Sequence, residues 1–503
     1  MPTATTGPGT QAATQNSSSG KLAAFLKKFT VILGAPRELW LVFAIKLVGV
    51  AAYGINNSTL KLWLSSDLGY SDRKALGLVA AWSFTMTGIT LLVGSLTDAV
   101  GFRKTFFLGV WVCIVGRAVM AFTGLKWLAL AGGLFPLAIG EALGSPVLVA
   151  AVRKYSNTKQ RSIAYSIIYA VMNAGFLIAS FVFDYVREGL GEHGQVHLLG
   201  FSFSTYRVLL LLALALEISL LPLVYFLRKG LEVTDDGIRI IPEQPKYTGQ
   251  SFLNSFWFTL RDSARDTWRL FAGLLRQSSF ARLIAFLMLI AFLKLIFMQM
   301  YYVFPTFGIR ELGDGAPVGK LWAINSILII PLALIVGALV QRFSAYGLVI
   351  VGGVISAASV FIMALPTEWF GPLTDNQVMH WIALHYLGLK GTVHPYYPMI
   401  ILFIILLSVG EAFYSPRVYE YAAAIAPKGQ EASYSSLSYV PFLLAKILVG
   451  TLSGGLLAAY CPEQGTRHSG TMWLVVALTA SVAPVGLLIF RRYIRVHEVG
   501  RQD

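Results

Sequence analysis

Apolar residues in this chain gather into long runs, with charged residues concentrated between them. A helix of about 20 apolar residues crosses the roughly 30 Å hydrocarbon core of a bilayer. We count twelve such runs, six in each half of the chain. The runs cover approximately 37–58, 75–99, 104–124, 127–151, 161–186 and 206–228, then 280–304, 316–340, 346–365, 396–424, 431–458 and 470–493. The pattern predicts an all-α integral membrane protein with twelve transmembrane helices in two pseudo-symmetric six-helix bundles.

The polar segments divide the chain into five parts. Residues 1–36 are expected to form a disordered cytoplasmic tail, because their first twenty positions are mainly small or polar and contain no apolar core. Residues 37–228 and 280–493 are expected to form the two bundles, and 494–503 a cytoplasmic C-terminal tail. In the linker 229–279, aromatic and arginine side chains recur largely at helical spacing over 251–276. That spacing predicts an amphipathic helix on the cytoplasmic membrane surface.

Composition supports a lipid environment. The chain is 56% hydrophobic and 13% charged, with a mean hydropathy of +0.66, whereas soluble proteins carry about 25% charged residues. The net charge of +15 does not indicate nucleic acid, because most basic residues lie in short segments between apolar runs. This placement follows the positive-inside bias and predicts a multi-pass cell-membrane protein with both termini in the cytoplasm.

Motifs of enzymes and metal sites are missing from the sequence. It contains no H-E-x-x-H, Walker loop or G-x-S-x-G, so we expect neither an enzyme nor a bound cofactor. His193 and His197 have i, i+4 spacing but stand in a Gly-rich segment without a Cys or carboxylate cluster, so we expect no metal. Two cysteines, Cys113 and Cys461, give no disulfide framework.

One motif occurs twice. Residues 140–146 and 410–416 both read G-E-A-x-x-S-P, and their glutamates lie 270 positions apart (411 − 141) inside long apolar runs. A carboxylate within a membrane span is costly and is a functional-site hypothesis by default. Its repetition at matched positions indicates a duplicated bundle, as secondary transporters have.

A second motif joins the second and third apolar runs. Residues 94–104 read G-S-L-T-D-A-V-G-F-R-K, which resembles the signature loop of the major facilitator superfamily. The resemblance implies the major facilitator fold and alternating access between two halves. Asp98 and Arg103 would then form a conformational gate, paired in one state and released in another.

A more particular resemblance concerns the fifth and tenth runs. Residues 165–175 read Y-S-I-I-Y-A-V-M-N-A-G, similar to F-S-I-F-Y-x-x-I-N-x-G of the proton-coupled oligopeptide transporters. Residues 410–416, followed by A-P at 426–427, are similar to their G-E-x-x-x-S-P…A-P, and 297–299 are similar to their F-E-Q. The resemblance implies that Glu411 faces the central cavity and holds a substrate amino group.

The chain also departs from that family. Anchored on Tyr53-Gly54, the positions of the family's E-x-x-E-R in the first helix read I-K-L-V-G at 45–49, and its lysine in the fourth helix is Ser145 here. The family uses these positions to couple protons and to bind the peptide carboxylate. The sequence therefore supports the superfamily over nearly the whole chain and leaves the solute open.

Buried charges define the candidate site. Lys46 and Lys294 stand in the first run of each half, each seven residues before a tyrosine, while Glu141 and Glu411 stand in the fourth. In the superfamily these helices line the central cavity, so the four charges are expected to converge there. Candidate substrate-binding residues are Lys46, Lys294, Glu411, Glu141, Tyr53, Tyr301, Asn173, Gln299 and Lys446.

Two hypotheses of different class remain open. In the first, the protein is a secondary transporter whose expected partners are protons and a small anionic or zwitterionic solute such as a short peptide, amino acid or organic anion. The transporter would be a monomer in which Glu141 or Glu411 carries the proton. In the second, the protein kept the fold but lost transport and acts as a membrane sensor or scaffold. The symmetric charges would then be structural salt bridges. Arg117 is interpreted as a snorkelling or helix-pairing residue.

Overall fold

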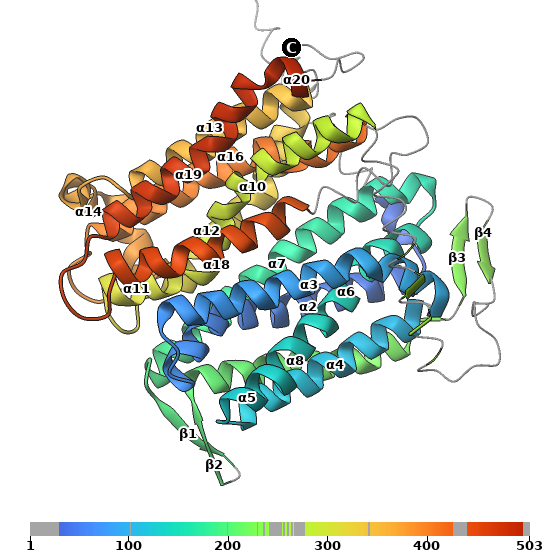
Figure 1. The fold of residues 1–503 in the computed structure, drawn as a ribbon, viewed down its shortest axis with the longest axis horizontal. Helices are drawn as coiled ribbons and strands as arrows, with labels where there is room; N and C mark the ends of the chain where they lie inside the picture. Colours follow the sequence, from blue (N-terminus) through green and yellow to red (C-terminus); the bar gives the residue numbers. More distant parts are fainter. Residues whose placement is uncertain are drawn as a thin grey trace, which may run out of the picture.

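The computed structural model describes residues 30–100, 102–198, 200–228, 230–234, 237–240, 277–340, 343–425 and 440–495, with isolated positions between 254 and 265. The chain is mostly helical, and its helices form two bundles (Figure 1). The prediction of an all-α membrane protein is thereby confirmed. The amphipathic helix expected over 251–276 and both terminal tails lie almost entirely outside the described residues.

Six long helical segments make the first bundle. Its elements are α2 (Arg37–Leu62, continued by the π turn η2, Trp63–Asp67), α3 (Asp72–Val100), α4 (Phe102–Phe122), α5 (Lys126–Leu128), η3 (Ala129–Leu134), α6 (Phe135–Lys154), α7 (Thr158–Leu190) and α8 (Thr205–Tyr225). A short helix η1 (Thr30–Gly34) precedes them. The predicted run 127–151 is thus built from α5, the π turn η3 and α6 in succession.

The second bundle repeats this plan. Its elements are α10 (Ser278–Tyr302), α11 (Phe304–Leu312), α12 (Val318–Leu339), α13 (Ala345–Ile362), α16 (Tyr396–Ile425), α18 (Val440–Tyr460), α19 (Ser469–Ile489) and α20 (Arg491–Ile494). Across the described ranges, nine helices are long and apolar enough to cross a membrane. Three more, α3, α12 and α18, coincide with the remaining predicted runs.

Short elements join the long helices. Two antiparallel hairpins, β1 (Gln195–Leu198) with β2 (Phe201–Ser204) and β3 (Leu231–Thr234) with β4 (Gly237–Ile240), follow α7 and α8. Between α13 and α16 stand η4 (Thr367–Phe370), α14 (Gly371–Thr374), α15 (Gln377–Trp381) and η5 (Ile382–Tyr386). The hairpins were not predicted, because strands of four residues carry too little periodicity to be recognised.

The repeated G-E-A motif has the same packing role in both bundles. A Cβ on Gly140 of α6 would lie 2.8 Å from the carbonyl oxygen of Gly109 in α4, and a Cβ on Gly410 of α16 would lie 2.8 Å from that of Gly352 in α13. Glycine is therefore required where the third and fourth helices of each bundle touch. The internal repeat seen in the sequence corresponds to a repeat in three dimensions.

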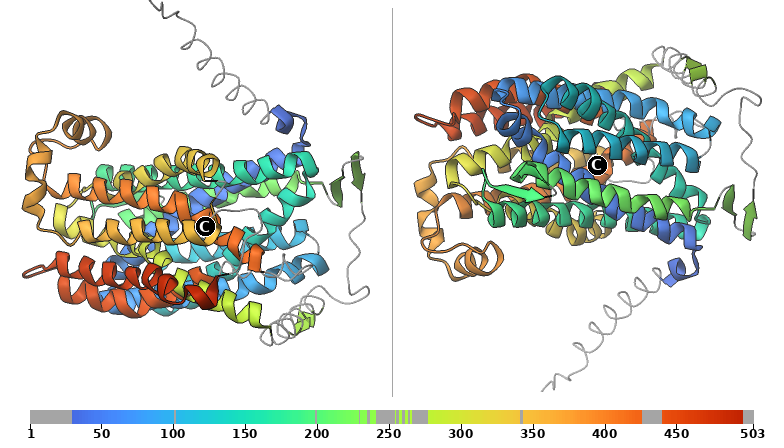
Figure 2. Two further views of the ribbon diagram at one scale, coloured as in Figure 1. Left: turned by 90° about the horizontal axis from the view of Figure 1, so that it is seen from above. Right: turned by 90° about the horizontal axis from the view of Figure 1, so that it is seen from below.

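The two bundles pack closely at one end of the molecule, which we call the α11 end. There a Cβ on Gly319 of α12 would lie 2.3 Å from the carbonyl oxygen of Ser180 in α7, and one on Gly454 of α18 would lie 2.9 Å from Cα of Arg73 in α3. At the opposite end, here the α20 end, the second bundle rises away from the first (Figure 1). Figure 2 shows the same bundles from above and below.

Candidate functional site

The four charges predicted to converge lie inside the bundles. Lys46 and Lys294 are 8% and 4% exposed, and Glu141 and Glu411 are half-buried. Lys46 interacts electrostatically with Glu141, and Lys294 with Glu411. Each lysine of a first helix thus faces the glutamate of the fourth helix in its own half.

Glu141 is held by an arginine. Arg117 of α4, which is fully buried, forms an ion pair with Glu141, and its Nη1 donates to Oε2 of Glu217 in α8 at 2.6 Å. One guanidinium therefore bridges two carboxylates, and such charge-assisted bonds are the strong ones in proteins. The sequence interpretation of Arg117 as a helix-pairing residue agrees with these contacts, and the alternative of a snorkelling residue is wrong because the side chain is fully buried inside the bundle, but its two acidic partners were not predicted. The available signal was a basic residue and two acidic residues in three apolar runs of the same half.

The same cluster could be mistaken for a metal site. The ligand atoms of Cys113, Glu141 and Glu217 lie within 4.8 Å of one another. However, the guanidinium of Arg117 already bonds both carboxylates and supplies the positive charge that a metal ion would bring. The arrangement therefore fits a buried ion-pair cluster.

Glu411 has different surroundings. Its Oε2 accepts a hydrogen bond from Asn325 of α12 at 3.0 Å, and the same amide nitrogen lies 3.0 Å from the hydroxyl of Ser408. Gly109 of α4 and Gly352 of α13 hold matching positions, because each packs against the glycine of a G-E-A motif. Arg117 stands eight residues after Gly109, and Val360 stands eight residues after Gly352, so Val360 occupies the position that Arg117 has in the first bundle. Val360 is fully buried. Within the described ranges, no guanidinium forms an ion pair with Glu411.

Lys294 lies beside the second motif. Its Nζ donates to the hydroxyl of Ser415 at 3.0 Å and stands 4.8 Å from the ring centre of Tyr414. The lysine is therefore in contact with the residues that follow Glu411 in the repeated sequence.

Lys446 connects the two bundles. It lies in α18 of the second bundle, is 5% exposed, and its Nζ is 3.4 Å from Oγ1 of Thr87 in α3 of the first. It also interacts electrostatically with Glu141. Glu141 is thus faced by a lysine from each half.

Two predicted polar residues bond within their own bundle. Gln299 is buried and donates to the hydroxyl of Ser453 in α18 at 2.5 Å. Asn173 is also buried, and its side chain donates to the carbonyl of Tyr169 one turn earlier in α7 at 3.0 Å. The hydrogen bond of Gln299 joins α10 to α18, and that of Asn173 lies within one turn of α7.

Tyr53 and Tyr301 belong to an aromatic row that crosses both bundles. The ring centres are 6.4 Å apart for Tyr53 and Phe176, 5.7 Å for Phe176 and Tyr301, and 5.9 Å for Tyr301 and Trp322. Trp82 also stacks on Tyr53, with ring centres 6.4 Å apart. Tyr53 and Tyr301 follow Lys46 and Lys294, respectively, by seven helical residues. Each tyrosine therefore lies about 10 Å further along its helix than the lysine, toward the α11 end. The row therefore covers the lysines on that side.

Polar contacts close the α11 end beyond the aromatic row. The carboxylate of Asp184 in α7 accepts from the backbone nitrogens of Gly319 at 2.9 Å and Lys320 at 2.6 Å, at the start of α12. Lys320 also pairs with Glu188 at 2.7 Å, and Arg310 of α11 pairs with Asp72 of α3 at 2.8 Å. Each contact joins the first bundle to the second.

The predicted gate of Asp98 and Arg103 is only partly described. The guanidinium of Arg103 lies 5.0 Å from the ring centre of Tyr225 in α8. The side chain of Asp98 falls outside the described residues, so its pairing with Arg103 stays a prediction.

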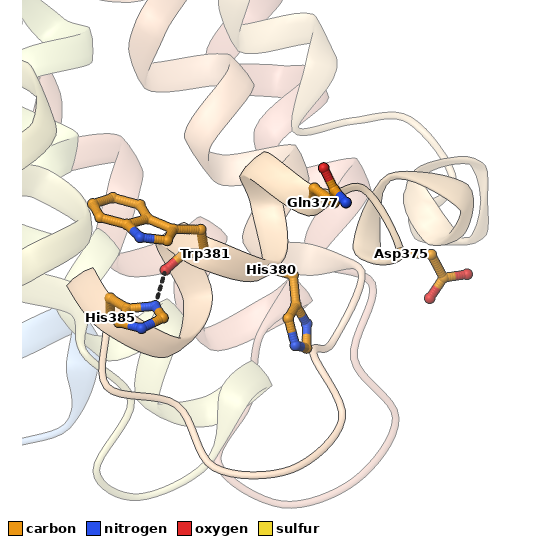
Figure 3. A pocket seen from close by; sticks show the side chains of 5 residues that line it. All are labelled: Asp375, Gln377, His380, Trp381 and His385. Carbon is orange, nitrogen blue, oxygen red and sulfur yellow. Dashed lines mark hydrogen bonds between the residues drawn. The ribbon is translucent and has the colours of Figure 1, made fainter.

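An exposed pocket lies on the segment of the chain that joins α13 to α16, away from the buried charges. Asp375, Gln377, His380, Trp381 and His385 line it (Figure 3). His380 and His385 point in different directions, and His385 stacks on Trp381 with ring centres 5.5 Å apart. The histidines do not converge on a common point where a metal could bind.

Paired helical bundles around buried charges define the class: a multi-pass membrane transporter, not an enzyme. Residues 42–393 match the family model of the Major Facilitator Superfamily. The chain belongs to this superfamily.

Solved structures of other transporters share the fold of this chain. The chain resembles a POT family transporter crystallised with 5-aminolevulinic acid, with a TM-score of 0.67 and 16% identity, over 92% of this chain and 97% of that one. Likewise, the POT family transporter PepTSo matches with a TM-score of 0.64 and 14% identity over 92% and 99%. The resemblance to this branch is thereby confirmed at the level of the fold.

Matches in sequence are shorter. Dipeptide and tripeptide permease A of Proteus mirabilis is 24% identical over 159 residues, which are 31% of this chain and 33% of that protein. Methyl viologen resistance protein SmvA of Salmonella typhimurium is 32% identical over 114 residues, or 22% and 23%. The aligned part spans about a third or less of these curated relatives.

Proposed function

We propose that this chain is a proton-coupled secondary transporter that moves a small zwitterionic or anionic solute by alternating access. The observation that carries the proposal is the unequal setting of the two matched glutamates. Both glutamates are half-buried, but Glu141 is paired with a buried arginine, whereas Glu411 accepts a hydrogen bond from a neutral amide. A carboxylate of the second kind can gain and lose a proton without leaving a buried guanidinium unpaired.

Glu411 is the proton carrier in this proposal, and Glu141 is structural. A proton on Glu411 cancels the charge that faces Lys294. Lys294 then offers its ammonium to a negative group of the solute. Departure of the proton restores the attraction between the two side chains and favours release of the solute. Proton movement and solute movement are linked because they use the same lysine.

The conformation described here fits one stage of such a cycle. The aromatic row and the contacts of the α11 end separate the buried charges from that end. Positive-inside placement of basic residues puts the α20 end and both termini in the cytoplasm of a cell-membrane protein. The chain is then open toward the cytoplasm, and its contacts at the α11 end must break to admit solute from outside. We propose that it works as a monomer.

The relatives suggest which solutes to test. Their printed names include dipeptides, tripeptides and 5-aminolevulinic acid, which all carry an amino and a carboxyl group. The positions where the peptide family places E-x-x-E-R differ in this chain, so the way it holds the carboxylate differs as well.

Uptake into proteoliposomes tests the proposal. We expect uptake of radiolabelled alanyl-alanine or 5-aminolevulinic acid to rise with an inward proton gradient. Glu411→Gln should abolish the response to the gradient while counterflow exchange of the solute continues, because exchange needs no net proton movement. Asp375→Asn is the matched control, since it makes the same change on the exposed loop and should behave as wild type. Gradient-driven uptake that survives Glu411→Gln would refute this proton carrier.

The rival hypothesis, a sensor or scaffold without transport, predicts neutralised charges within each half. Arg117 meets that expectation in the first bundle through ion pairs with Glu141 and Glu217, whereas in the second bundle Glu411 accepts a hydrogen bond from Asn325 and is attracted electrostatically by Lys294. The two hypotheses separate in one preparation. Solutes that raise the melting temperature yet never accumulate inside liposomes, with or without a gradient, would favour the rival.

A further inference from the structure

The short helices that join α13 to α16 carry large apolar side chains that the bundles do not cover. Trp369 of η4 and Leu373 of α14 are 66% and 41% exposed, and Val378 and Trp381 of α15 are 67% and 59% exposed. The members of each pair stand four or three residues apart, so each pair lies on one side of its helical turns. Because η4 contacts α14 and α14 contacts α15, we call these four residues the α14–α15 surface.

Other side chains of the same segment pack against the second bundle. Phe370, Ala383 and Leu387 are buried, and Phe370 and Leu387 belong to the main hydrophobic core. Tyr386 of η5 donates to the carbonyl oxygen of Lys320, at the start of α12, at 2.8 Å. The segment is therefore held in place, with apolar side chains both toward the bundle and away from it. Short helices that are apolar on both sides are expected to be covered on both sides.

The α14–α15 surface continues the side of α13 that faces lipid. α13 is one of the helices long and apolar enough to cross a membrane, and its side chains Val351 and Val354 are exposed. Only residues 363–366 separate α13 from η4, and Leu365 among them is exposed as well. A link of this length places η4 within about 18 Å of the end of the span. The exposed apolar side chains thus extend from the span to the level of the bilayer interface.

The segment also lies at the edge of the molecule. In Figure 1 α14 stands at the α11 end, and both views of Figure 2 show its segment reaching sideways past the long helices. An element that extends sideways at the end of a membrane span lies along the plane of the membrane. Tryptophan is enriched at this level, because its ring combines an apolar body with a polar N–H group.

Charge decides what kind of lipid contact the segment can make. Residues 363–395 contain two acids, Glu368 and Asp375, one lysine, Lys390, and no arginine. Surfaces that bind anionic headgroups carry clusters of lysine and arginine. The apolar side chains are therefore the part of this segment that suits a membrane, and no anionic headgroup is required.

We propose that the α14–α15 surface binds the lipid interface of the leaflet at the α11 end, with its four side chains at the boundary between headgroups and acyl chains. The proposal goes beyond the transport function and does not depend on the solute or on protons. Tyr386 connects the same segment to the start of α12, where the carboxylate of Asp184 from α7 is bonded. The lipid contact is thereby joined to the contacts that close the α11 end.

Spin labels at single positions test the surface. Val378→Cys in the full-length chain is labelled with a nitroxide and reconstituted, one chain per particle, in phosphatidylcholine nanodiscs. Collisions of the label with oxygen, which enters lipid, and with a water-soluble nickel chelate report its depth. We expect the label to lie about 5–10 Å into the boundary between headgroups and acyl chains.

A label at the same end of the molecule provides the matched control. Gln464 is exposed in the turn after α18, beside Cys461, whose carbonyl oxygen accepts a hydrogen bond from Arg310 of α11. The label on Gln464→Cys should lie in water. Both natural cysteines are buried, and wild type treated alike measures any background labelling. A label at Val378 that is as accessible to nickel as the one at Gln464 would overturn the proposal.

Removing the tryptophans tests whether apolar side chains hold the surface. In the Val378→Cys background, Trp369→Ser together with Trp381→Ser should move the label toward water. Trp127→Ser removes an exposed tryptophan of α5 in the first bundle and should leave the depth unchanged. A depth that the double substitution does not change would contradict the assigned role of the two rings.

The lipid and the state of the label give two further decisions. The depth should be the same when part of the phosphatidylcholine is replaced by phosphatidylglycerol, and a depth that appears only with the anionic lipid would overturn insertion by apolar side chains. Protection of the Val378 label from both oxygen and nickel would mean that protein, such as a second copy of the chain, covers the surface, and would overturn the lipid contact.

Discussion

At the scale of single residues, one side chain distinguishes the two copies of the repeated motif. Arg117 neutralises the first glutamate, and Val360 stands at the matching position of the second bundle. Duplicated sequence thus gives two carboxylates of different chemistry. One is fixed in an ion-pair cluster, and the other is left to a neutral amide and a lysine.

Replacing the buried arginine should therefore destabilise the protein. Arg117→Met leaves Glu141 and Glu217 without their shared partner, and removal of one member of a buried ion pair costs about 3–5 kcal/mol. We expect a loss of that size in the free energy of unfolding, measured by detergent-denaturant titration. Arg492→Met, which changes an exposed arginine of α20, should have little effect. Equal stability of the two variants would show that the bridge contributes little.

Sequence reasoning reached these residues unevenly. It singled out Glu141, Glu411, Lys46 and Lys294, because a charge inside an apolar run is visible in one dimension. The partner of Glu141 was missed, because Arg117 lies 24 positions away and meets it only when α4 packs on α6. Which charge pairs with which is decided by helix packing, and a single sequence does not contain that information.

At the scale of elements, the close contacts of α4 with α6 and of α13 with α16 depend on glycine. A methyl group on Gly410 would lie 2.3 Å from Oγ of Ser356, and one on Gly140 would lie 2.6 Å from Sγ of Cys113. Both distances are shorter than atoms tolerate, so the helices would have to separate.

Alanine at these positions should loosen the bundle. Gly140→Ala and Gly410→Ala are each expected to cost about 1–3 kcal/mol of stability through overpacking, visible as a lower melting temperature in detergent. Gly88→Ala is the matched control, because a methyl group on this glycine of α3 meets nothing within 4 Å. It should be neutral or slightly stabilising, since alanine favours helix more than glycine does. Destabilisation by Gly88→Ala alone would contradict the packing argument.

The elements themselves were predicted from hydrophobic runs, but their ends were not. The second run begins at 75 by apolarity, whereas α3 begins at Asp72, whose carboxylate pairs with Lys61 and Arg310. Polar residues at helix ends extend a helix beyond its apolar part when they find partners in other elements. The π turns η2 and η3 likewise leave no mark on hydropathy.

At the scale of the whole molecule, two groups of contacts between described residues hold the bundles together at the α11 end. One joins α7 to the start of α12 through Asp184, and the other joins α3 to α11 and α18 through Asp72 and Gly454. Both must open if solute is to enter from that side. In the proposed alternating-access cycle, the closed end is therefore a part that must move.

Cross-linking the closed end should stop transport. Glu188→Cys together with Lys320→Cys replaces an ion pair between the bundles. A short bifunctional thiol reagent should then abolish uptake, and cleavage of a reducible linker should restore it. Each single variant, treated alike, should keep its activity. Uptake that continues after complete cross-linking would contradict alternating access through this end.

The natural cysteines favour this experiment. Cys113 and Cys461 are both buried, and burial raises the pKa of the Cys461 thiol, so that it reacts slowly as a nucleophile. The introduced pair should be labelled first, and wild type under the same treatment measures any background.

In the proposed mechanism, the unequal glutamates would also determine how much electrical charge crosses the membrane in each turnover. If Glu411 alone exchanges a proton, a solute with no net charge enters together with one positive charge. A membrane voltage of 100 mV, negative inside, then adds about 2.3 kcal/mol to the driving force, or roughly 50-fold in the accumulation ratio. A solute with one net negative charge would cross without current. In this proposal Arg117 keeps Glu141 from exchanging a second proton, so the net charge of the solute decides whether transport responds to membrane voltage.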